Sequence, residues 1–246
     1  MPSAAEIEGF ISRLEARVAP AEKAAREAWW RLATTGTEEA RKELVRAGME
    51  YTRLFADRNG YETVARWHGE RDALENALLR RQVEVLYRTF AGHEGDEEIL
   101  GRIQELEAEA NAVYGNHRGV VQGREVGENE IREILRSSDD GALRREAWEA
   151  SKTVGREVEE TVRKLARLRN RLAREAGYPD HFHRALDLQE IDAAQLDRIM
   201  TDLASATGAP FRKLKEDLDA TLEKRFAVES VMPWHLYDPF FQSCKH

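Results

Sequence analysis

Two histidines in the second half of the chain have the residue type and spacing of metal ligands. His181 and His183 stand two residues apart in the stretch YPDHFHRALD, with Asp180 and Asp187 close by in sequence. Because side chains two apart on a helix point to different faces, both imidazoles could bind one ion only in an extended or irregular segment. Metal sites usually have three or more protein ligands. A pair of structural or partly exposed histidines is the alternative interpretation.

A second candidate lies in the aromatic segment MPWHLYDPFF, residues 232–241. His235 and Asp238 are three residues apart, a spacing at which a carboxylate could orient an imidazole that binds a metal. The same two residues could equally cap a turn between the flanking prolines. Trp234 and Tyr237 are the candidate ligand-binding residues here, because aromatic rings stack on ligands, with core packing as the alternative. A segment this apolar is expected to pack against something.

Other catalytic patterns are weaker. Helical zinc peptidases use H-E-x-x-H, in which two histidines share a helix face and the glutamate activates metal-bound water. The nearest stretch is HEGDE at residues 93–97, where Glu97 replaces the second histidine and Gly95 weakens the helix, so we predict a surface turn. Cys244 has no identifiable catalytic partner. We therefore assign no catalytic residue.

Composition excludes several classes of protein. The 246 residues include 41% apolar residues, enough for a core, and 34% charged residues with a net charge of -8. Acidic and basic residues are interspersed, so no concentrated basic surface is expected to bind nucleic acid. No stretch approaches the roughly 18 apolar residues of a membrane helix, and the N-terminus lacks a leader pattern. The sequence predicts a cytoplasmic protein with no membrane partner.

Helices are predicted for most of the chain. Residues 21–178 contain no proline, and apolar residues recur at steps of three and four. We predict one long amphipathic helix over 140–176, ended by Gly177 and Pro179. Gly208 and Pro210 are expected to separate a helix over 192–207 from another over 211–226.

Only residues 115–127, GNHRGVVQGREVG, are predicted to be non-helical, as a short hairpin or an extended crossing. A phosphate loop is the alternative, but the Lys and Ser or Thr that should follow its last glycine are absent. The predicted fold is all-α, an elongated bundle of long antiparallel helices. Its predicted parts are an N-terminal lobe over 1–114, the crossing over 115–127, and a second lobe over 128–246.

Three stretches resemble the angiotensin-converting-enzyme-like and oligoendopeptidase-like zinc metallopeptidases. Residues 137–182 carry that family's helix–turn pattern, residues 112–135 fit its extended crossing and short helix, and MPWHLYDPFFQ, 232–242, is similar to the stretch ahead of its catalytic half. The matching positions in the first stretch are Arg144, Trp148, Leu168, Asn170, Ala173, Gly177 and Tyr178.

The resemblance implies a mostly helical enzyme with a channel that admits short peptides. It also implies a zinc ion held by H-E-x-x-H and a later glutamate, elements that lie downstream of the matching region. No zinc ligand can therefore be assigned to any position of this sequence. The chain is expected to be the N-terminal half of such a peptidase, truncated before the zinc motif and without peptidase catalysis. In its relatives the aromatic segment would lie buried under the second half.

Two other functions stay open. One is a stand-alone metal-dependent hydrolase of small peptides, esters or lactones that uses His181, His183 or His235. The other is a helical interaction or dimerisation module. No cofactor is assigned, although a divalent metal other than zinc stays open. The expected partners are a second copy of the chain, a complementing C-terminal half, or a short peptide or other small molecule, since exposed apolar surface favours association.

Overall fold

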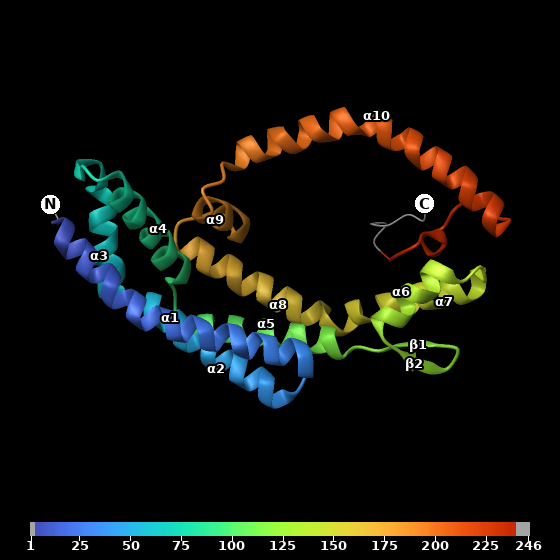
Figure 1. Ribbon diagram of the computed structural model, residues 1–246, viewed down its shortest axis with the longest axis horizontal. Helices are drawn as coiled ribbons and strands as arrows, with labels where there is room; N and C mark the ends of the chain where they lie inside the picture. The colour runs from blue at the N-terminus through green and yellow to red at the C-terminus, as the bar shows by residue number, and fades with distance from the viewer. Residues whose placement is uncertain (1–2, 240–246) are drawn as a thin grey trace. The chain divides into compact units, whose positions relative to one another are not determined.

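The computed structural model describes residues 3–239 and is almost entirely helical (Figure 1). Its first helices are α1 (Ala4–Thr35), α2 (Glu38–Phe55), α3 (Arg58–Gly69), α4 (Ala77–His93) and α5 (Glu97–Asn116). After strands β1 (Gly119–Val121) and β2 (Arg124–Val126) come α6 (Glu128–Ser137), α7 (Gly141–Lys152), α8 (Val154–Glu175), α9 (His181–Leu188) and α10 (Ala193–Phe226). Short 3-10 turns occupy Arg71–Ala73 and Pro233–His235. The predicted all-α fold is confirmed. Within residues 3–239, no helix combines the length and apolar character that a membrane span requires.

The described chain divides into two compact units, each built from two separate stretches. Unit 1 contains residues 3–115 and 161–193, and unit 2 contains residues 116–160 and 194–239. The first part of α8 therefore belongs to unit 2 and the rest to unit 1. The predicted lobes, over 1–114 and 128–246, are continuous stretches instead, and that division stays a prediction.

Helices begin where a side chain can accept hydrogen bonds from the free N–H groups of the first turn. The residues that do so are Ser3, Thr37, Asp57, Asn76, Asp96, Asp140 and Asp180. At its other end α8 stops close to the predicted place, because Gly177 adopts a positive φ of 86°. The Tyr178 N–H then donates to the carbonyl of Ala173 at 2.9 Å, which satisfies a carbonyl of the last turn.

The predicted single helix over 140–176 is wrong, since the stretch is divided into α7 and α8 at Thr153, where the backbone keeps right-handed helical angles but the hydrogen-bond pattern of the α-helix is interrupted. Side-chain hydroxyls compete here for helix carbonyls. Ser151 donates to the carbonyl of Trp148 at 2.6 Å, and the Thr153 hydroxyl donates to that of Ala150 at 2.7 Å. The Thr153 amide bonds the same Ala150 carbonyl at 3.3 Å, three residues back instead of four. Apolar periodicity continues across this break and therefore conceals it.

The predicted separation at Gly208 and Pro210 is also wrong, because α10 continues through both residues as one curved helix (Figure 1). A proline inside a helix removes one backbone hydrogen bond and pushes away the carbonyl four residues earlier. A helix can absorb that loss by bending, with water bonded to the freed carbonyl. Pro20 lies inside α1 in the same way.

Unit 2 contains a β-hairpin, one of the two alternatives predicted for residues 115–127, although Gly115 and Asn116 belong to α5 and not to a non-helical stretch. Strands β1 and β2 pair antiparallel through a turn at Gln122 and Gly123, whose φ angles of 51° and 74° are typical of a type I′ turn. A Cβ on Gly119 would lie 2.9 Å from that of Ala150, so glycine lets β1 approach α7. The buried cluster of this unit is Val121, Val126, Ile131, Leu135, Ala147 and Ala150.

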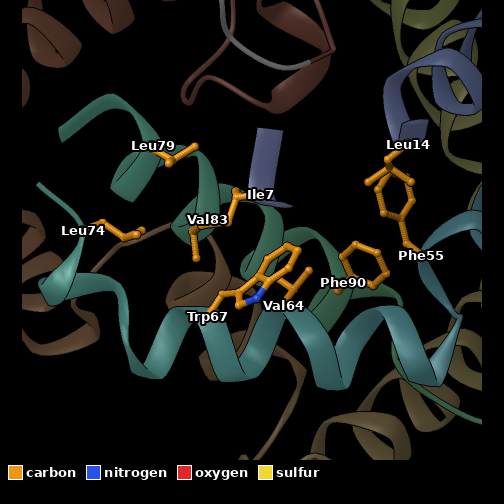
Figure 2. Close-up of a cluster of buried hydrophobic side chains, with 9 residues drawn as sticks. All are labelled: Ile7, Leu14, Phe55, Val64, Trp67, Leu74, Leu79, Val83 and Phe90. Carbon is orange, nitrogen blue, oxygen red and sulfur yellow. The ribbon is translucent and has the colours of Figure 1, made fainter. Parts of the chain in front are cut away.

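Unit 1 has the larger apolar core, formed by α1 to α4 (Figure 2). Its buried side chains are Ile7, Leu14, Phe55, Val64, Trp67, Leu74, Leu79, Val83 and Phe90. The ring of Phe90 meets that of Phe55 edge-on at 5.4 Å, and Phe10 meets Trp67 in the same way at 5.2 Å. A second cluster joins α5 to the part of α8 in this unit, through Ile99, Leu100, Ile103, Leu106, Leu165 and Leu172.

Replacing Trp67 by alanine should lower the free energy of unfolding by about 3–5 kcal/mol, because it empties a site in which the side chain is 1% exposed. Trp29→Ala is the matched control, since Trp29 is 54% exposed, and it should change stability by about 0.5 kcal/mol or less. Urea unfolding followed by circular dichroism measures both. Equal losses in the two variants would contradict the placement of Trp67 in the core.

Candidate functional site

The aromatic segment that the sequence marks as a candidate site is held in unit 2 by a buried arginine. Arg144, on α7, is 0% exposed. Its Nε and Nη2 donate to the carbonyls of Trp234 and Leu236, and its Nη1 donates to that of Ser138, each at 2.8 Å. The guanidinium also lies over the Phe226 ring, 4.8 Å from the centroid. One side chain thereby joins the segment after α10 to the corner between α6 and α7.

The guanidinium of Arg144 stays charged although its surroundings lower its pKa. Burial lowers the pKa of Arg144 to about 10, and the nearby charge of Arg225 adds to the effect. Arg144 is still protonated at neutral pH, so its N–H groups remain charged donors to carbonyls, which are stronger than neutral ones. A second arginine borders the segment, because Arg225 donates to Asp139 at 2.8 Å and to the hydroxyl of Tyr237 at 3.0 Å.

His235 is buried in the same place, 4% exposed. Its Nδ1 accepts a hydrogen bond from the Met232 N–H at 2.9 Å, and its ring stacks on that of Phe226 with centroids 5.0 Å apart. Burial lowers the pKa of His235, and the charge of Arg144 lowers it further. With Nδ1 occupied, Nε2 is the ring nitrogen left for a metal or for a carboxylate such as that of Asp238.

The two aromatic candidates of this segment pack within unit 2. The Trp234 ring meets that of Trp148 at 6.0 Å, and Arg145 lies over it at 5.1 Å. Tyr237 accepts the bond from Arg225 already described. These contacts favour core packing, while ligand binding by Trp234 and Tyr237 stays a prediction. Residues 240 and 241 of the segment, and Cys244, lie outside the described residues.

His181 and His183 open α9 in unit 1, and Asp180 caps that helix. The Asp180 Oδ1 accepts from the His183 N–H at 3.0 Å and lies 2.8 Å from His183 Nδ1. The His181 N–H donates to the side chain of Asn170 at 2.9 Å. The segment is thus helical, not extended, and the condition under which both imidazoles could share an ion is not met. Among residues 3–239, no three or more His, Cys, Asp or Glu side chains gather to hold a metal.

Unit 1 contains a second buried arginine that sequence reasoning missed. Arg184, on α9, donates to the carbonyls of Ala91 at 2.6 Å and of Glu94 at 3.1 Å, at the end of α4. Burial lowers its pKa. Glu190 adds a bidentate pair with Arg81 of α4, at 2.5 and 2.6 Å. These bonds fix α9, and the histidines at its start, against α4.

Unit 1 carries an apolar groove on its surface. It lies among α1, α2 and α4, with a volume of about 360 Å³. Most of its lining is apolar, from Ile11, Leu14, Val18, Tyr51, Phe55, Val85 and Leu86. Glu15 and Arg81 supply charges of both signs. Such a groove suits an apolar side chain beside polar groups. The only sequence signal was the apolar periodicity of α2 and α4.

Arg144→Ala should lower the free energy of unfolding by roughly 3 kcal/mol, since each buried carbonyl left without a donor costs roughly 1–3 kcal/mol. Chymotrypsin should also cut residues 227–239 faster in this variant than in the wild type. Arg136→Ala is the control, because Arg136 is exposed on α6 and forms an ion pair with the exposed Glu133. A loss no larger than in this control would show that Arg144 does not hold the segment.

The stability that His235 contributes should depend on pH. In the folded protein the pKa of His235 lies below its ordinary value of 6.5, so the unfolded chain binds more protons between the two values. The contribution is therefore full above that ordinary value and is lost as the pH falls toward the folded pKa.

Urea unfolding between about pH 7.5 and about pH 5.5 tests this dependence. In His235→Asn the amide oxygen can still accept from Met232 but does not titrate, so this variant should lose less stability on acidification. The two proteins differ only at residue 235, so the difference between their losses measures the contribution of His235. Identical losses would contradict the assigned role.

Comparison with known proteins places most of the helical scaffold in one family. The family model described as angiotensin-converting enzyme matches residues 1–215, which span both units, while the sequence matches no curated protein. Residues 232–239 lie beyond the matched range, so their resemblance to the family stays a prediction. Arg144, Asn170, Gly177 and Tyr178 lie within it. The chain belongs to the angiotensin-converting enzyme family of metallopeptidases.

Proposed function

We propose that residues 1–246 form the helical, non-catalytic part of an angiotensin-converting-enzyme-like zinc peptidase. In this proposal peptides are cleaved only together with a part that carries H-E-x-x-H. The main support is that the family model matches residues 1–215 although the histidines lack the spacing of a zinc motif. No two of the seven histidines are four residues apart, and that spacing is what places two imidazoles on one helix face.

The histidines present do not fit the family's zinc site. His181 and His183 lie at the start of α9, and His183 Nδ1 is engaged by Asp180. The Nδ1 of His235 is engaged by the Met232 N–H. His235 belongs to unit 2 and the other two to unit 1. We therefore derive no catalytic step through zinc for these residues.

A contribution to peptide binding is supported by the groove of unit 1. Its volume of about 360 Å³ lies within the roughly 300–1,000 Å³ of small-molecule sites, so it can take one or two apolar side chains. Arg81 at its edge is a cation that could meet a peptide carboxylate, although Glu190 and Glu84 already share that charge. The proposed role is thus to bind or guide peptides, with bond cleavage performed elsewhere.

The purified 246-residue chain should hydrolyse none of a panel of short peptides, esters and lactones. Added zinc or calcium should not change this result, because a metal-activated water requires a site with several ligands. An active zinc peptidase in the same assay verifies the panel. Chelator-sensitive turnover by this chain would overturn the proposal and support a stand-alone hydrolase.

In that event, loss of turnover in His181→Ala with His183→Ala, or in His235→Ala, would locate the metal site. The other outcome is turnover that resists the chelator and survives both sets of substitutions. It would point to a contaminant, which gel filtration with activity profiling separates from the 28.2 kDa chain.

A further inference from the structure

Helix α10 carries an apolar stripe in which the sequence separations between successive residues are the same from either end. Its positions are Leu196, Met200, Leu203, Thr207, Phe211, Leu214 and Leu218. The steps between them are 4, 3, 4, 4, 3 and 4, so Thr207 is the centre of the pattern. At 3.6 residues per turn, all seven lie within about 40° of the direction of Thr207 and extend over about 33 Å. The stripe is therefore narrow, and its spacing is symmetric about Thr207.

The middle of this stripe is exposed in the described structure, while Leu196 and Leu218 at its ends are partly buried. Leu222 is the only buried residue of the 34 in α10, while Leu203, Phe211 and Leu214 are 52%, 51% and 63% exposed. Helices in proteins draw most of their stability from packing of an apolar face, and contiguous exposed apolar patches mark interaction sites. The middle of α10 is thus a surface suited to a partner.

We propose that the partner is a second copy of this chain, with the two α10 helices antiparallel and a two-fold axis at Thr207. In that arrangement Leu203 meets Phe211 of the second copy, and Met200 meets Leu214 of the second copy. A two-fold interface must be self-complementary, because the same surface serves both copies. The mirror-symmetric spacing of the stripe supplies that property, which an interface with an unrelated protein would not need.

The centre of the stripe allows two helices to come close. Residues 204–210, ASATGAP, are all small or proline. Short side chains at a crossing point let the helix axes approach, at the lower end of the usual separations. The Thr207 hydroxyl donates to the carbonyl of Leu203 at 2.7 Å, so its polar group is already bonded when water is excluded.

Charges beside the stripe agree with the antiparallel arrangement. Asp197 and Lys215 lie along the same edge of α10, each about 80° from the direction of Thr207. The two-fold axis places Lys215 near Asp197 of the second copy, and the reverse pair forms at the other end. Lys215 bonds Asp219 of its own helix at 2.5 and 2.6 Å, which orders its side chain at this edge.

Sedimentation equilibrium of the full chain at micromolar concentration tests the interface. The wild type should be a dimer, and Leu203→Asp should weaken dimerisation at least tenfold, because it buries two unpaired carboxylates. Ser205→Asp is the matched control, since residue 205 is exposed on the opposite face of α10; it should dimerise as the wild type does. A monomeric wild type, or a dimer that Leu203→Asp leaves unchanged, would overturn the proposal.

Two further variants test the geometry even if Leu203→Asp perturbs α10. In a Cys244→Ser background, Thr207→Cys should form a disulfide between copies under mild oxidation, whereas Ser205→Cys should not. Asp197→Lys and Lys215→Glu should each weaken the dimer, and the double variant should restore it. Equal cross-linking through residues 205 and 207, or no restoration, would exclude this arrangement. Dimerisation and peptide hydrolysis are measured separately, so this inference and the proposed function can fail independently.

Discussion

A buried guanidinium bonded to backbone carbonyls is the interaction on which unit 2 depends. Arg144 joins three carbonyls, from Ser138, Trp234 and Leu236, that no continuous element would bring together. Hydrogen bonds from a charged donor contribute about 1.5–3 kcal/mol each, against a desolvation cost of several kcal/mol for the buried ion. The net stabilisation is therefore smaller than the sum of the bonds. The larger effect is on specificity, since only one path of the chain satisfies all three.

Unit 1 also contains a buried arginine that donates to backbone carbonyls. Arg184 reaches the carbonyls at the end of α4, where the last turn of a helix leaves acceptors unsatisfied. Gly95, which follows that turn with φ at 157°, could not carry a side chain because a Cβ would lie 2.8 Å from Leu172. The end of α4 is thus fixed by a cation from α9 and by close packing against α8.

The sequence allowed the helical scaffold to be predicted but not these anchors. Apolar periodicity and Gly177 gave most helices and one of their ends correctly, because burial and positive φ leave local signals. The interruption at Thr153 and the continuity through Pro210 were missed, since hydroxyl competition and helix bending leave the periodicity unchanged. Arg144 could not be singled out as buried among 38 basic residues, because its acceptors lie up to 92 positions away.

The positions that carry the family resemblance have structural roles here, which explains why a family can be recognised without its chemistry. Trp148 packs on Trp234, Asn170 accepts from the start of α9, and Tyr178 donates to Asp187 at 2.6 Å. Each fixes a helix end or a corner. Such residues preserve the scaffold whether or not a metal site is attached to it, and the site must be argued from its own ligands.

Helix α10 has an anchored C-terminal end and an exposed middle. The two parts are therefore stabilised in different ways. Near its C-terminus, Leu222 is buried and Phe226 lies between Arg144 and His235, so this end is stabilised within unit 2. The middle of α10 is more exposed, and helix propensity alone is marginal in water, the more so with a proline and a glycine present. Any protein that covers the middle of α10 must bind the folded form in preference to the unfolded one. By mass action, binding of a partner to the apolar stripe therefore increases the helicity of that stretch, and the two are thermodynamically coupled.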